Sequence, residues 1–249
     1  MSKHQPHLSK ISILHYFKLV FRSALLITAT VLYILNRVGD PQAPFGSVGQ
    51  KPVILGLIWI FFTVGMILRF FPSHTESMGC QKQFKSNFIP TETSTPALQS
   101  ARTTALVALV WIVLNALIGI LYYTKLIDGG ILLLICLFYS VCDMICILFF
   151  CPFQTWFMKN KCCGTCRIYN WDYAMMFTPL IFLPSVYTWS LLGLALLLLL
   201  VWEISFRLHP ERFSESTNAC LTCSHCPEKL CHHKKQLRVF LKKNKFVRK

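Results

Sequence analysis

Five apolar segments, each near the length that crosses a lipid bilayer, dominate this sequence. They occupy residues 16–36, 52–70, 104–124, 130–151 and 173–206. A helix of about 20 apolar residues covers the roughly 30 Å hydrocarbon core of a membrane. A soluble domain of this size cannot bury so many long apolar helices. The sequence therefore predicts an all-α integral membrane protein, a bundle of about five transmembrane helices.

The chain has few charged residues, and most of them are basic. Only 14% of the residues are charged, against about 25% in an average soluble domain, and 25 Lys and Arg face 10 Asp and Glu, a net charge of +15. Many of the cations lie at the end of the chain: Lys234, Lys235, Arg238, Lys242, Lys243, Lys245, Arg248 and Lys249. On a chain already in a bilayer, such a tail favours anionic lipid as its partner rather than nucleic acid. Its apolar positions also permit a basic amphipathic helix.

The last apolar segment, 173–206, is too long for one straight span and too short for two. Pro179 and Pro184 interrupt its first half, and each favours a kink. One interpretation is a single long kinked helix. The other is a re-entrant or short hairpin segment over residues 173–187, followed by a span over residues 189–202.

The distribution of Lys and Arg favours the hairpin. The N-terminus, the second and fourth loops and the tail are basic, whereas the first and third loops carry few cations. By the positive-inside rule both termini are then cytoplasmic, which requires an even number of crossings. We expect a multi-span domain over residues 1–206 in the cell membrane and a cytoplasmic, cysteine-rich tail over residues 207–249. This topology puts both cysteine clusters of the chain on the reducing, cytoplasmic face.

The tail carries a run of four cysteines, Cys220, Cys223, Cys226 and Cys231. The run resembles the C-x2-C-x2-C-x3-C-P ligand run of bacterial ferredoxins, although its last gap is four residues and its proline follows the third cysteine. The resemblance implies an iron–sulfur cluster, 4Fe–4S, held by these four thiolates. Zinc is the competing interpretation, with His225, His232 or His233 replacing one thiolate. A third is cysteines that hold no metal.

A second cluster, Cys162, Cys163 and Cys166, follows the fourth apolar segment. Two adjacent cysteines followed by glycine resemble the CCG motif of heterodisulfide-reductase-type iron–sulfur proteins. Cys163 and Cys166 also have the spacing of a redox pair, and we expect flanking Lys161 and Arg167 to lower their pKa values. The cluster and His232 are candidate metal ligands, for a second centre or for the first. A thiol redox pair, or unmodified or palmitoylated cysteines, are the other interpretations.

Asp143 lies near the middle of the fourth apolar segment, which also carries Cys136, Cys142, Cys146 and Cys151. A carboxylate there costs about 2.5–3.5 kcal/mol on insertion scales, so we expect it to face the bundle interior and to have a partner. Asn115 on the third segment is a candidate partner. A proton site or a quinone-headgroup site is the functional interpretation. A buried hydrogen-bonded pair that fixes helix packing is the structural one.

Together these features predict a membrane-bound iron–sulfur redox protein. It would pass electrons between a cytoplasmic redox partner protein and a membrane quinone or another membrane acceptor, with Asp143 handling protons. The alternative is a non-enzymatic, zinc-stabilised membrane protein, a transporter or an assembly factor. The sequence has no G-x4-G-K-[ST], G-x-S-x-G, H-E-x-x-H or G-x-G-x-x-G motif, which argues against the common ATP-driven, hydrolase, zincin and dinucleotide-binding classes.

Overall fold

A computed structural model describes residues 10–39, 52–72, 81–93, 95–160 and 163–222. Over these ranges the chain is helical and has no β-strand beyond an isolated bridge between Pro90 and Asn218. Four helices are long and apolar enough to cross a membrane: α1 (Lys10–Gly39), α5 (Ala101–Tyr123), α6 (Gly129–Leu148) and α8 (Val186–Leu208). The predicted all-α architecture is thus confirmed for the described residues.

The second apolar segment forms a shorter helix, α3 (Pro52–Ile67), of 16 residues. At 1.5 Å per residue it is about 24 Å long, less than the roughly 30 Å of a hydrocarbon core. The structure therefore supports four spanning helices by length and composition, and a fifth span at α3 stays a prediction.

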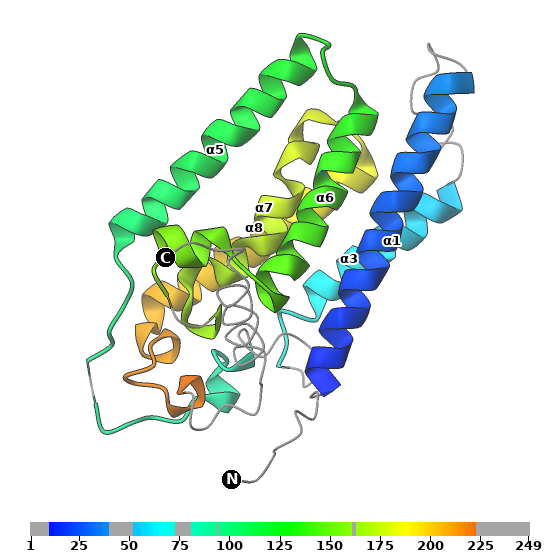
Figure 1. Ribbon diagram of the computed structural model, residues 1–249. Helices are drawn as coiled ribbons and strands as arrows, with labels where there is room; N and C mark the ends of the chain where they lie inside the picture. Colours follow the sequence, from blue (N-terminus) through cyan, green and yellow to red (C-terminus); the bar gives the residue numbers. More distant parts are fainter. Residues whose placement is uncertain (1–9, 40–51, 73–80, 94, 161–162, 223–249) are drawn as a thin grey trace, which may run out of the picture.

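The last apolar segment is divided, not continuous. It begins with a short arm made of α7 (Asp172–Phe177) and the 3-10 helix Thr178–Phe182 (η5), and α8 follows after a break. Pro184 lies in that break. Ser185 and Thr188 then form a capping box, in which each backbone N–H donates to the other residue's hydroxyl at 3.2 Å. The chain reverses here, so that the arm and α8 form a hairpin (Figure 1).

The arm lies at the centre of the bundle. It packs against α5, α6 and α8, while α1 packs along α6 and α3 along α8 (Figure 1). The main hydrophobic core joins α3, α6, α7 and α8 through Phe62, Met66, Cys136, Tyr173, Met176, Phe177, Leu180, Leu191, Leu192, Ala195, Leu198 and Trp202. α5 reaches this core mainly through the arm. Its Gly119 lies directly under the Phe182 ring, which leaves no space for a β-carbon.

Irregular segments cap one end of the bundle. The backbone N–H of Ala219 donates to the Ile89 carbonyl at 2.8 Å. The fully buried Asn218 side chain donates to the carbonyls of Lys82 and Arg212 at 3.0 and 2.9 Å. Residues 207–222 of the predicted tail domain are thus folded against residues 81–93. The basic part of the tail, predicted to bind anionic lipid, lies outside the described residues.

Candidate functional site

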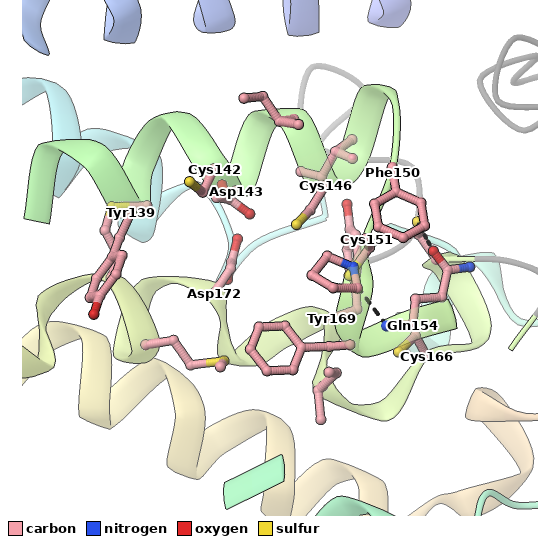
Figure 2. A pocket seen from close by; sticks show the side chains of 18 of the residues that line it. Tyr139, Cys142, Asp143, Cys146, Phe150, Cys151, Gln154, Cys166, Tyr169 and Asp172 are labelled. Carbon is pink, nitrogen blue, oxygen red and sulfur yellow. Dashed lines mark hydrogen bonds between the residues drawn. The ribbon is translucent and has the colours of Figure 1, made fainter. Parts of the chain in front are cut away.

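A pocket of about 490 Å³ lies among α6, the segment that follows it, α7 and part of α5 (Figure 2). Its volume is in the range of sites that bind small molecules. Its walls are largely apolar, but five cysteines from three segments line it: Cys142, Cys146, Cys151, Cys163 and Cys166. Two carboxylates, Asp143 and Asp172, line it as well. Folding therefore brings Asp143 and three cysteines of the fourth apolar segment into one site with part of the second cysteine cluster.

The end of α6 positions the first three thiols. Cys142 and Cys146 are four residues apart, and so lie on one face of the helix. The helix ends at Leu148, with Phe149 as its C-cap, because Pro152 cannot continue it. The π-helical turn Phe153–Phe157 follows, and Cys151 precedes this turn with its Sγ accepting a hydrogen bond from the backbone N–H of Gln154 at 3.4 Å. Cys146 and Cys151 both line the pocket at this end of α6.

Gln154 joins these thiols to the second cluster. Its side chain is buried, and its Oε1 accepts a hydrogen bond from the Cys163 thiol at 3.3 Å. Its Nε2 donates to the Asn160 carbonyl at 3.2 Å, which fixes the orientation of the amide. One glutamine thus contacts Cys151 through its backbone and Cys163 through its side chain. The result is a row of sulfur atoms along the wall of the pocket.

Of the two thiols of the second cluster that the structure describes, Cys166 is the more buried, with 4% of its surface exposed. Burial raises the pKa of its thiol to about 12, and the neighbouring Cys163 adds to the rise. The expectation that flanking cations lower this pKa is therefore wrong for Cys166, because desolvation dominates. Arg167 does not act on the thiol, since its guanidinium is paired with Glu203.

The carboxylates of Asp143 and Asp172, which both line the pocket, point toward each other (Figure 2). Asp143 accepts a hydrogen bond from Arg22 of α1 at 2.8 Å, and the same Arg22 nitrogen donates to the Ser140 carbonyl at 2.9 Å. The predicted partner, Asn115, instead donates to the Trp111 carbonyl of its own helix. The partner of Asp143 is therefore a cation that the sequence places in the basic flank of the first span.

Asp172 is paired in the same way with Arg69, which follows α3. Two guanidinium nitrogens meet its two carboxylate oxygens at 2.7 and 2.5 Å, and both side chains are less than 10% exposed. The guanidinium also lies over the Tyr173 ring, 4.7 Å from its centroid. Each acid at the pocket is thus balanced by an arginine from another helical segment.

A third ion pair holds the Cys163–Cys166 loop. Arg167 donates to Glu203 of α8 at 2.7 Å, and the Trp171 indole N–H donates to the other carboxylate oxygen at 2.8 Å. The guanidinium lies 4.3 Å from the centroid of the Phe206 ring. From the other side Gln83 donates to the Gly164 carbonyl at 2.9 Å. The loop is therefore anchored both to α8 and to the cap.

The predicted site residues divide into three groups. Asp143, Cys163 and Cys166 line the pocket. Cys220 lies outside it, in the cap, with its thiol donating to the Asn87 carbonyl at 2.9 Å. The remaining predicted ligands lie outside the described residues: Cys162, Cys223, Cys226, Cys231 and His232. Within the described ranges no three His, Cys, Asp or Glu side chains are grouped to hold a metal ion.

The two cysteine clusters nevertheless begin at the same end of the bundle. Lys82 and Gln83 are consecutive in the cap, and they bond to Asn218 and Gly164 respectively. Asn218 precedes Cys220 by two residues, and Gly164 follows Cys163. The start of the tail run and the second cluster therefore flank the same stretch of the cap.

The sequence assigned no role to several residues of the site: Cys142, Cys146, Cys151, Gln154, Asp172, Arg22 and Arg69. Part of the site could have been predicted from the sequence, since Cys142 and Cys146 share a helix face and Pro152 marks the end of the helix. The partners of the acids come from distant segments and leave no local signal. No protein-family model, curated protein or solved structure matches this chain, so its function is argued from the geometry of the site.

Proposed function

We propose that this chain is a multi-pass membrane redox protein. It passes electrons between a cysteine centre at the capped end of the bundle and a hydrophobic carrier of the quinone class in the pocket. The observation that carries this proposal is the pocket itself, an apolar cavity that brings five thiols and two carboxylates together. A thiol-rich wall offers electrons and protons, and the carboxylates are placed to relay the protons that quinone reduction consumes.

The walls suit a flat apolar ring. The Trp111 and Tyr139 rings line the pocket with centroids 4.9 Å apart. At the rim, Leu114, Phe138, Ile145 and Phe150 are exposed on the outer surface of the helices. In a bilayer this surface faces lipid, so a lipid-soluble carrier reaches the cavity without crossing water.

Asp143 is the proposed proton site, and its environment supports that role. A quinone takes up two protons with two electrons, so an acid beside the ring is required. Asp143 lines the pocket, and Asp172 faces it across the cavity. Pairing with Arg22 keeps a carboxylate in a place where an isolated charge is expensive.

For the centre, the proposed ligands are Cys220, Cys223, Cys226 and Cys231, holding a 4Fe–4S cluster. Cys162, Cys163, Cys166 and His232 would serve a second centre or the same one. The shared cap supports this arrangement, because it brings Cys163 and Cys220 to one end of the bundle. The alternative remains zinc, which would tie the tail to the cap without carrying electrons.

Metal analysis of anaerobically purified protein tests the centre. We expect a broad absorbance near 400 nm, with iron and acid-labile sulfide, both lost in Cys223→Ser. Cys136→Ala is the control, since Cys136 is buried in the main core and does not line the pocket. Zinc without sulfide would overturn the iron–sulfur centre and support the non-enzymatic alternative.

A matched pair of variants tests the pocket. Cys142→Trp fills the cavity, whereas Leu109→Trp adds the same ring to the exposed surface of α5 outside it. We expect Cys142→Trp to lose at least tenfold in kcat/KM for a short-chain quinone, and Leu109→Trp to keep it. Equal activity of the two variants would remove the pocket from the proposal.

We also propose that both termini are cytoplasmic and that the membrane is the cell membrane. The basic N-terminus and tail support this orientation. Labelling of single-cysteine variants with an impermeant thiol reagent tests it in intact cells and in inverted vesicles. A cysteine at residue 4 and Cys220 should both react only in inverted vesicles. Reaction of either in intact cells would reverse the assignment for that end.

A further inference from the structure

We propose that Cys146 and Cys151 are a dithiol–disulfide pair that gives two electrons directly to the carrier in the pocket. The inference deepens the proposed function and rests on it, because the quinone-class carrier is the oxidant. It assigns a covalent redox site in the wall of the bundle, apart from any metal centre.

The end of α6 creates the pair. In a continuous helix, residues five apart point about 140° away from each other, since each residue turns by about 100°. Here the backbone widens after Ile145, whose carbonyl accepts from the N–H groups of both Phe149 and Phe150, at 2.8 and 3.1 Å. Cys151 is thereby brought back toward Cys146, and both side chains lie at the wall of the same pocket (Figure 2).

Both sulfur atoms face the cavity that would hold the oxidant. Cys146 and Cys151 are partly buried and part of the pocket lining (Figure 2). The Gln154 N–H that donates to the Cys151 Sγ stabilises negative charge on that sulfur. This contact assigns Cys151 as the thiol that reacts first and Cys146 as the thiol that closes the disulfide.

The reaction balances with one quinone. The S–H bonds of Cys146 and Cys151 break and one S–S bond forms between them. The two electrons and two protons released convert the quinone to a quinol. Asp143, on the same helix and in the same cavity, lies on the path by which a proton reaches the carrier. No further oxidant is required.

Disulfide mapping tests the pair on the full-length protein in detergent. Fully reduced protein receives one equivalent of a fully substituted short-chain benzoquinone without oxygen, because such a ring cannot take up a thiol by addition. We expect two thiols to be lost for each quinol formed, and non-reducing peptide mass spectrometry to find a Cys146–Cys151 disulfide. Cys146→Ala and Cys151→Ala should each lose both products.

Cys136→Ala is the matched control, since Cys136 lies on the same helix, α6, but is buried in the main core and does not line the pocket. It should keep the disulfide and the quinol yield within twofold. Thermal unfolding of each variant identifies any that fails to fold. For such a variant Cys→Ser at the same position takes its place.

Two failures are distinguishable. If the protein reduces the quinone while Cys146 and Cys151 remain thiols, the pair is overturned and the proposed function stands. If quinone is neither bound nor reduced, the proposed function fails and the pair fails with it. A disulfide that maps to Cys163 and Cys166 would also overturn the assignment.

Discussion

Arg22 of α1 donates a hydrogen bond to Asp143 of α6 at 2.8 Å, across 121 residues of sequence. The side chains are 3% and 13% exposed, and the guanidinium also lies 5.5 Å from the centroid of the Phe62 ring. The pair fixes α1 against α6 at one height. It also removes two isolated charges from a region where each would be costly.

Breaking this pair should destabilise the bundle. Asp143→Asn leaves Arg22 buried without a counter-charge, and we expect a loss of about 3–5 kcal/mol in the free energy of unfolding. The double variant Arg22→Met/Asp143→Leu removes both charges and should recover most of the loss. Unfolding in detergent micelles measures both. Additive losses in the double variant would show that the two side chains do not act as a pair.

The same double variant separates structure from proton transfer. If Asp143 supplies a proton to the carrier, Arg22→Met/Asp143→Leu should be folded and yet reduce quinone at least tenfold more slowly than the natural protein. Stopped-flow measurement of quinol formation gives the rate. Full activity in the folded double variant would assign Asp143 to packing alone.

Cys166 should be the slowest of the described thiols in the loop to react. Its pKa of about 12 keeps it protonated at neutral pH, and alkylation requires the thiolate.

Because the folded pKa of Cys166 lies above the ordinary value of 9.0, the stability that Cys166 contributes is complete below pH 9 and is lost as the pH rises toward 12. Unfolding measured from pH 8 to pH 11 should therefore decline less in Cys166→Ala. Parallel decline in both proteins would contradict the shift.

Glu203→Gln should loosen the Cys163–Cys166 loop. It weakens the bonds from Arg167 and leaves that cation partly buried, at an expected cost of about 1.5–3 kcal/mol. The rate at which iodoacetamide labels Cys163 should rise several-fold, followed by mass spectrometry. Glu215→Gln is the control, because Glu215 is exposed in the cap. Equal labelling of the two variants would separate the loop from this ion pair.

Two glycines offer a comparison within helices. Gly119→Ala places a methyl group against the Phe182 ring and should lower the melting temperature by several degrees. Gly193→Ala meets nothing within 4 Å and should raise it slightly, because alanine favours the helix. Differential scanning fluorimetry measures both. A neutral Gly119→Ala would mean that α5 is not held by the arm.

Apolarity alone predicted where α1, α5 and α6 lie, because a helix that contacts lipid needs little information beyond its length and composition. The break before α8 was one of the two interpretations that Pro179 and Pro184 allowed, and the distribution of Lys and Arg favoured it. The length of α3 could not be predicted, since the apolar run continues past Ile67 while the helix ends there. A run of apolar residues indicates that a segment lies in an apolar environment. It does not determine at which residue the backbone hydrogen bonds of a helix end.

The site was harder to predict than the fold. Asp143 stands out because it is an acid in an apolar run, but its partner Arg22 looked like an ordinary residue of a basic flank. Gln154 is a neutral side chain in an irregular turn and has no recognisable pattern. Its two contacts with sulfur exist only because the chain turns at Pro152 and returns at Cys163. Such pairings are properties of tertiary structure.

The ion pair between Arg22 and Asp143 also sets an order for assembly during synthesis. At 5–20 residues per second, a ribosome takes about 6–24 s to add the 121 residues that separate the two side chains. Throughout that interval α1 carries an unmatched cation and has no α6 to pack against. The helix must therefore wait at the insertion machinery or the membrane surface, and it becomes a stable part of the bundle only when α6 enters the bilayer beside it.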